Sequence, residues 1–250
     1  MNADEQLSLL VAECDRIAQL SLEDTTTPVP SMPDWTIEKL VRHLTFVHRM
    51  ATGVLAVPAE AGMSEVLAAV EKPERGPRIL DDYRDSAAAM FDAYRAASPA
   101  REVTTWTGVA TPAFWIRRQL HEITVHRFDV QDALHAVGGA APDPADATGA
   151  ADGVAEWAEA CLTRIPTGSL GGVAGRTVHL HTDDGTDMEL FLDFTGDAVA
   201  VSREHRKGDV ALRGSAEDLL LTVWRRRPLG TVEIVGDAAV AEALYESARL

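Results

Sequence analysis

The chain has 250 residues, of which 46% are hydrophobic, and its formal net charge is −16 at pH 7. Such an acidic chain lacks the basic patches that binding to nucleic acid or to an anionic membrane surface requires, so we expect neither partner. No stretch approaches the ~20 consecutive apolar residues of a membrane span. The acidic start, Met1 to Glu5, does not resemble a signal peptide. Two cysteines, Cys14 and Cys161, form neither a disulfide framework nor a metal cluster. We therefore expect a cytoplasmic protein with reduced thiols.

The first part of the chain has the periodicity of amphipathic helices. Apolar side chains recur at helical spacing from Leu7 to Leu20, and a second helix begins at Asp34 or Thr36, either of which can cap its free amides. A third helix is predicted over 79–97, and a fourth runs from Pro112 to about Val137. Four helices joined by short or moderate loops predict an antiparallel four-helix bundle over residues 1–145.

The Gly- and Pro-rich run Gly138–Pro144 marks the predicted boundary, and residues 146–250 form a second domain. One helix is expected through Val154 to Leu162. After Gly175 apolar residues alternate with polar ones, which is typical of strands. The predicted strands cover 178–182, 188–194, 198–202, 210–212 and 231–235, with helices over 215–226 and from 237 onward. The fold class is therefore α+β, with a helical bundle followed by a small domain whose sheet is expected to be antiparallel.

Three residues are candidates for a metal site: His43 in the second predicted helix, and Glu122 and His126 in the fourth. Residues four apart on a helix are neighbours on one face, so Glu122 and His126 can converge on one point. If His43 faces them, the set of two histidines and one carboxylate leaves coordination positions open. That composition is typical of a catalytic divalent-metal site.

Two other interpretations compete with the catalytic metal site. The run from His121 to His126 is no zinc-protease motif, because its histidines are five apart and point about 140° away from each other on a helix. A plainer hypothesis makes Glu122 and His126 a helix-surface pair and His43 a core histidine with its hydrogen bonds satisfied. Spacing alone leaves the metal site and this plainer hypothesis open.

Two segments resemble the mycothiol-dependent maleylpyruvate isomerase family. The sequence DWTIEKLVRHL, from Asp34 to Leu44, is similar to the family's GWT-x-x-DLVAHL opening, and EITVHRFD, from Glu122 to Asp129, resembles its E-x-x-VHRxD segment. The resemblance covers nearly the whole chain and implies a DinB-like metal-binding bundle followed by a sterol-carrier-like domain. It also implies that His43, Glu122 and His126 bind a divalent metal, usually zinc.

The resemblance implies a chemistry as well. A low-molecular-weight thiol, mycothiol, would occupy the open metal position, where coordination deprotonates it. In the family's named member the thiol adds to the double bond of maleylpyruvate, the bond rotates, and the thiol leaves. Two alternatives stay open: a mycothiol S-transferase that acts on another small-molecule electrophile, and a non-catalytic metal- or ligand-binding regulatory module.

The basic cluster Arg225–Arg227 is a further candidate. The resemblance implies that an arginine of the second domain approaches the site, and Arg226 is the nearest match, so it is predicted to bind a carboxylate of mycothiol or substrate. The alternative is a solvated helix end, where cations are favourable. His179, His181 and Asp183 alternate on a predicted strand and are interpreted as a solvent-facing side of the sheet, without a metal.

Overall fold

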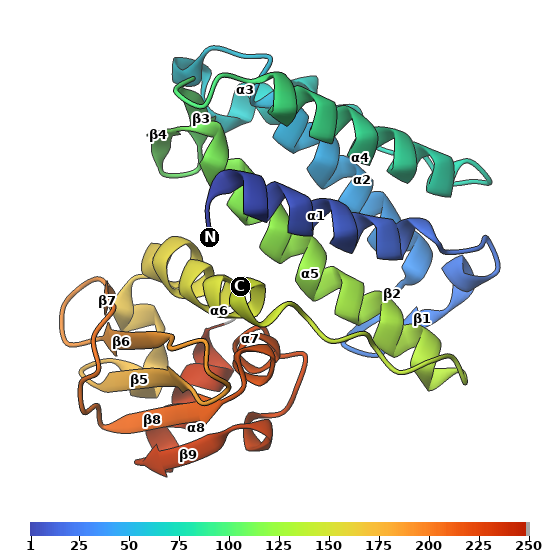
Figure 1. Cartoon of the computed structure of the whole chain (residues 1–250). Coiled ribbons are helices and arrows are strands. Elements are labelled where there is room, and N and C mark those ends of the chain that lie inside the picture. The colour runs from blue at the N-terminus through green and yellow to red at the C-terminus, as the bar shows by residue number, and fades with distance from the viewer. Residues whose placement is uncertain (249–250) are drawn as a thin grey trace. The chain divides into compact units, whose positions relative to one another are not determined.

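The structure is a computed structural model that describes residues 1–248. The chain divides into two compact units, Met1–Asp143 and the part from Pro144 onward. The first unit is mainly helical and the second contains a five-stranded sheet (Figure 1). The predicted α+β class is therefore confirmed.

Four long helices form a bundle in the first unit. Helix α1 packs against α4 and α5, and α2 packs against the same two helices, as Figure 1 shows. All four predicted helices are present, and a short fifth one, α3, was not predicted. The helices are α1 (Ala3–Ala18), α2 (Ile37–Gly53), α3 (Met63–Ala69), α4 (Ile79–Ala96) and α5 (Pro112–Ala136).

Local sequence signals explain where these helices begin. Asn2 and Glu5 form a capping box at the start of α1. Of the two candidate caps for α2, Thr36 is the one used, since its side chain accepts from the amide of Lys39. Pro112 is the first residue of α5, where the missing amide hydrogen costs nothing.

Two short hairpins also belong to the first unit, and the sequence did not predict them. Strands β1 (Pro28–Val29) and β2 (Met32–Thr36) pair antiparallel, as do β3 (Val103–Thr105) and β4 (Gly108–Ala110). Three of these four strands have only two or three residues, which is too short to show a period of two, and β2 contains Pro33 and Asp34, which are unfavourable in strands. The first hairpin leads directly into α2, because Thr36 both ends β2 and caps the helix.

The second unit begins with a helix and continues into the sheet. Its first helix, α6, passes into a π-helical turn over Trp157–Cys161 and then into three 3₁₀ turns, Leu162–Arg164, Thr167–Ser169 and Gly171–Val173. A further 3₁₀ turn, Leu229–Thr231, precedes the last strand. The main elements are α6 (Ala147–Glu156), β5 (Thr177–Thr182), β6 (Glu189–Asp193), β7 (Ala200–Ser202), β8 (Val210–Gly214), α7 (Ala216–Val223), β9 (Glu233–Gly236) and α8 (Ala238–Ser247).

The sheet has the strand order β7-β6-β5-β8-β9, and its central pair, β5 and β8, is parallel. The prediction of an antiparallel sheet was therefore wrong. The other three pairs are antiparallel. Alternation of apolar residues identifies a strand but not its partner, and a parallel pair needs a long crossover connection. Here the crossover consists of β6, β7 and the loop that follows, which returns the chain to the centre of the sheet.

Among residues 1–248, no helix is both long enough and apolar enough to cross a membrane.

Candidate metal centre

The bundle brings His43, Glu122 and His126 together. His43 projects from α2 and the other two from α5, two helices that pack against each other. Nε2 of His43 lies 2.9 Å from Oε1 of Glu122, and Nε2 of His126 lies 3.4 Å from the same oxygen. The two imidazole rings are 5.2 Å apart, centroid to centroid. One carboxylate oxygen and two imidazole nitrogens therefore face a common point.

Charged neighbours fix the orientation of two of these three side chains. Arg118, one turn before Glu122 on α5, donates to Oε2 of Glu122 at 2.7 Å, which leaves Oε1 turned toward the histidines. Asp129 lies 2.8 Å from Nδ1 of His126. Because an ionised carboxylate only accepts hydrogen bonds, Nδ1 carries the hydrogen and Nε2 is the nitrogen presented to Glu122. This arrangement of a carboxylate behind a histidine is typical of metal sites.

The same contacts perturb the protonation of the group. Burial raises the pKa of the Glu122 carboxyl, but hydrogen bonds from His126 and His43 and the charge of Arg118 outweigh it and hold this pKa well below its usual value. Burial lowers the pKa of His126, and the hydrogen bonds to Asp129 and Glu122 raise it to about 9. Without an ion, a second proton on His126 gives the ring a positive charge, which partly offsets the negative charges of the Glu122 and Asp129 carboxylates. A divalent cation at Nε2 would replace that proton.

The three side chains are partly exposed to solvent, and His43 of α2 is the most exposed. The exposed fraction of the side chain is 32% for His43, 21% for Glu122 and 12% for His126. Three protein ligands with an exposed side leave room for a fourth, exchangeable ligand, in contrast to the closed ligand set of a structural zinc site. The donor atoms and their surroundings thus fit a divalent ion such as zinc.

Two family models match the chain. The mycothiol maleylpyruvate isomerase N-terminal domain matches residues 9–131, and the MDMPI C-terminal domain matches residues 149–243. The chain belongs to the mycothiol-dependent maleylpyruvate isomerase family. Membership indicates an enzyme, and the resemblance inferred from the two segments around His43 and Glu122 is confirmed.

Solved structures of the mycothiol-dependent maleylpyruvate isomerase share the fold. A mutant with a histidine-to-alanine substitution aligns with a TM-score of 0.60 and 14% sequence identity, over 94% of this chain and 93% of that chain. A second structure of that isomerase aligns with a TM-score of 0.58 and 16% identity, again over 94% and 93%.

A UbiJ-SCP2 ubiquinone synthesis protein aligns with 22% identity over 39% of this chain and 91% of its own, but with a TM-score of only 0.30. A score that low does not support a common fold, so the sterol-carrier-like character of the second domain stays a prediction. No curated protein matches the chain.

Other residues of the family motif in this chain have structural partners. Arg127 is fully buried and donates to Glu13 of α1 at 2.8 Å. It links α5 to α1, while Asp129 orients His126. Arg127 and Asp129 therefore pair with or orient their neighbours.

Arg226 lies in the second unit, in the turn that ends α7. Arg225 has a φ of 63°, and the amide of Arg226 donates to the carbonyl of Leu221 at 2.7 Å. This is the Schellman pattern, in which the residue after the C-cap adopts a left-handed conformation. The guanidinium of Arg226 donates to the carbonyl of Trp224. Helix α7 thus ends at Val223, three residues before the predicted end, and a role for Arg226 in ligand binding stays a prediction.

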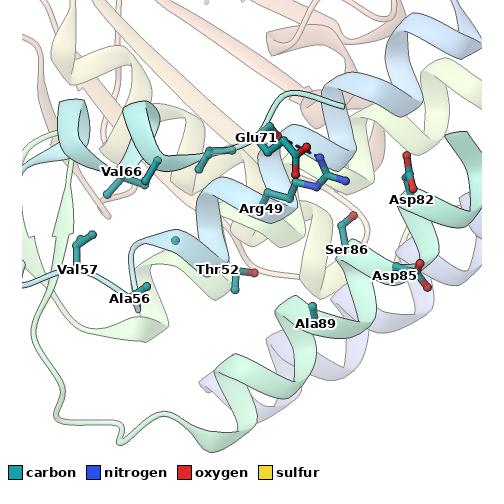
Figure 2. A pocket seen from close by; sticks show the side chains of 13 residues that line it. Arg49, Thr52, Ala56, Val57, Val66, Glu71, Asp82, Asp85, Ser86 and Ala89 are labelled. Carbon is teal, nitrogen blue, oxygen red and sulfur yellow. Dashed lines mark hydrogen bonds between the residues drawn. The ribbon is translucent and has the colours of Figure 1, made fainter. Parts of the chain in front are cut away.

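A cavity of about 500 Å³ lies between α2, α3 and α4. Figure 2 shows Arg49 and Thr52 from α2, Val66 from α3, and Asp82 and Ser86 from α4 along its wall. Several of the lining residues come from the segment that connects α2 to α4. None of the three candidate metal ligands lines it, however, so the cavity is not the coordination site.

The interpretation of His179, His181 and Asp183 as a solvent-facing side of the sheet was wrong for His179, whereas Asp183 is exposed as expected. His179 is buried, and His179 and His181 both contact Glu189 on the neighbouring strand. His205 joins them to give a second group that could hold a metal ion, without Asp183. The sequence contained a signal for two members, the alternating His-x-His in β5, but Glu189 and His205 are brought close only by strand pairing and a loop.

Proposed function

We propose that this family member is a zinc-dependent enzyme that uses mycothiol in a reaction of the maleylpyruvate isomerase type. In such a reaction a thiol adds reversibly to a carbon–carbon double bond, which becomes free to rotate before the thiol leaves. The observation that carries the proposal is the convergence of His43, Glu122 and His126, with one side of the group open to solvent.

Each ligand has a defined role in the proposed site. His43 and His126 hold the ion through Nε2, and Glu122 holds it through Oε1. Arg118 keeps the second carboxylate oxygen occupied, which favours a single bond from Glu122 to the ion. Asp129 keeps His126 in the tautomer that presents Nε2. Bound zinc would lower the pKa of a thiol at the open position, so that a thiolate nucleophile forms at neutral pH.

Cys14, the cysteine of the first unit, is a poor candidate for an alternative nucleophile. Burial raises the pKa of the Cys14 thiol, which disfavours its thiolate form. Cys161 belongs to the second unit, where its thiol donates to the carboxylate of Glu156. We therefore assign the sulfur nucleophile of the proposed reaction to a small thiol, mycothiol. We further propose that Arg226 binds a carboxylate of mycothiol or of the substrate.

The experiment is an isomerase assay with maleylpyruvate and mycothiol, run on the purified wild type, on His43→Ala and His126→Ala, and on His135→Ala as the control. His135 is an exposed histidine on the same helix as His126. We expect mycothiol-dependent turnover in the wild type and the control. We expect both ligand variants to lose that turnover together with one equivalent of zinc, while their circular dichroism spectra stay unchanged. Treatment with a chelator should abolish turnover in the wild type, and zinc should restore it.

Other outcomes would redirect or overturn the proposal. The protein would be identified as an S-transferase if it conjugates mycothiol to members of an electrophile panel but does not isomerise maleylpyruvate. Zinc lost in both ligand variants, with no turnover in the wild type, would identify a binding module. Equal zinc content in the wild type, His43→Ala and His126→Ala would overturn the metal site itself.

A further inference from the structure

We propose that the second unit carries its own divalent-metal site, formed by His179, His181, Glu189 and His205, which binds zinc or a similar transition-metal ion. Ligand atoms of these four side chains lie within 4.8 Å of one another. The group contains three of the eight histidines of the chain. The inference is independent of the function proposed for the first unit, because it uses none of the same residues.

Strand pairing places three of the four side chains on one face of the sheet. His179 and His181 are two residues apart in β5, and in the neighbouring strand β6 they pair with Phe191 and Glu189 respectively. Residues i and i+2 of a strand share a face, and directly paired side chains on that face are neighbours. Glu189 therefore reaches both imidazoles: Oε2 contacts Nε2 of His179, and Oε1 contacts Nδ1 of His181.

The fourth side chain comes from the loop 203–209, between β7 and β8. Nδ1 of His205 lies 2.9 Å from Oε1 of Glu189, and its ring centroid lies 5.2 Å from that of His179 and 5.9 Å from that of His181. The next residue, Arg206, stacks on the ring of Phe191 at 4.5 Å. Since Phe191 is paired with His179, this contact holds the loop over the same face of the sheet.

The donor set suits a transition-metal ion. Three imidazole nitrogens and one carboxylate oxygen are ligands that zinc, nickel and copper accept, whereas calcium and magnesium prefer oxygen alone. Ligand atoms around a tetrahedral zinc lie about 3.4 Å apart, given bonds of about 2.1 Å. The four atoms therefore need only small movements to surround an ion. Without an ion, all three imidazoles share one carboxylate, and an ion at their centre would give each imidazole a bond of its own.

Burial in the group decreases from the sheet toward solvent. The exposed fraction of the side chain is 7% for His179, 25% for His181 and 77% for His205. An ion can therefore enter from the solvent side, and His205 is the ligand that closes over it. Binding would tie the loop to β5 and β6, so it should restrict that loop and stabilise the second unit.

The experiment is a zinc titration against a chromophoric chelator, combined with limited proteolysis by trypsin. The double variant His43→Ala/His126→Ala removes the first site, so any stoichiometric binding that remains belongs elsewhere. We expect it to bind one equivalent of zinc, and zinc to protect the loop from cleavage after Arg203, Arg206 and Lys207. Adding His205→Ala to this variant should weaken zinc binding by at least about tenfold and abolish the protection.

His205→Ala is suited to this test because the side chain is exposed and its removal leaves the core unchanged. Glu189→Gln supplies a second loss of ligand with nearly the same shape. His135→Ala, which removes an exposed histidine from the first unit, controls for nonspecific binding to surface imidazoles and should change neither readout. The proposal is overturned if the double variant binds no zinc stoichiometrically, or if binding and protection survive both His205→Ala and Glu189→Gln.

Discussion

Asp129 lies about one turn after His126 in α5 and accepts a hydrogen bond from its Nδ1 at 2.8 Å. The other oxygen of the same buried carboxylate accepts from the hydroxyl of Ser31, in the turn between β1 and β2. The small hairpin before α2 therefore supports a ligand on α5. The β1–β2 hairpin thus belongs to the site through Ser31, although its sequence shows no recognisable periodicity.

Replacing Asp129 by Asn tests this support. The substitution keeps the size of the side chain, but an amide no longer enforces one tautomer of His126 and carries no charge. We expect zinc affinity of the first site to fall about 10- to 100-fold, as is usual for residues behind a metal-bound histidine. The titration is best made in a His205→Ala background, where only the first site binds tightly. Ser31→Ala removes the outer hydrogen bond alone and should have the smaller effect; equal affinities for Asp129→Asn and the background protein would contradict the argument.

Arg226→Gln tests the arginine of the second unit. If the guanidinium binds a carboxylate of mycothiol or substrate, its loss should raise KM about tenfold or more, because a hydrogen bond to a charged group contributes about 1.5–3 kcal/mol. The zinc content should not change. Steady-state kinetics with each substrate varied in turn would identify the ligand that is bound. Arg225→Gln is the neighbouring control, since the side chain of Arg225 donates to the carbonyl of Tyr245 and has a structural partner. If Arg226→Gln has the same KM as the wild type, Arg226 does not bind the ligand, and its hydrogen bonds in the turn after α7 are its remaining role.

The parts of the fold that the sequence predicted are those with a strong local period. Leu40 and Leu44 repeat at helical spacing and both are fully buried in α2. Val178 and Leu180 alternate with histidines and are both fully buried in β5. Such patterns reflect one buried face of one element, which a single segment encodes completely. What lies opposite that face depends on pairing between distant segments, and for that reason the parallel contact of β5 with β8 could not be predicted.

The same distinction applies to the two candidate metal sites. Glu122 and His126 are four apart on one helix, so their proximity follows from the sequence alone. Spacing made His43 a candidate but left open whether it faces them, and the resemblance to a family motif supplied that expectation. In the second group, Glu189 opposes His181 only through the register of β5 and β6, and His205 arrives on a loop with no period at all. Without a family motif for those residues, the sequence offered no reason to bring them together.

Gly236 at the end of β9 is a position where the backbone requires glycine. Its φ is +111°, and a Cβ atom there would lie 2.5 Å from the carbonyl oxygen of Asp209 on the approach to β8. Gly236→Ala should therefore lower the free energy of unfolding of the second unit by about 1–3 kcal/mol, the usual cost of a strained backbone conformation. Urea unfolding followed by circular dichroism would measure the loss. Gly230→Ala is the matched control, because a Cβ atom there meets nothing within 4 Å; it should change stability by less than about 0.5 kcal/mol.

His48, fully buried in α2, should make the protein sensitive to mild acid. Its Nδ1 lies 3.1 Å from the hydroxyl of Ser86, which itself donates to the carbonyl of Tyr83, so Nδ1 carries the hydrogen of a neutral ring. Burial, with a smaller contribution from the charge of His43, lowers the pKa of His48 to about 3 from 6.5. Between these values the unfolded chain binds a proton that the folded one does not. The stability from the neutral ring is complete above pH 6.5, and it is lost as pH falls toward 3.

The expected slope from this one group is about 1.4 kcal/mol per pH unit within that window. Urea titrations at several pH values, with a chelator present, would measure it. His48→Asn removes the titrating group, while the amide of the new side chain can still donate to Ser86. The free energy of unfolding of this variant should therefore depend less steeply on pH than that of the wild type, by a slope that corresponds to at most one proton taken up on unfolding. The low pKa of Glu122 also favours the folded state above acid pH, but it affects both proteins equally and cancels in the difference. Equal slopes of unfolding free energy against pH in the two proteins would contradict this prediction. They would mean that His48 accepts a proton in the folded state without cost, although its imidazole is fully buried and lies against Ser86 and Cys14.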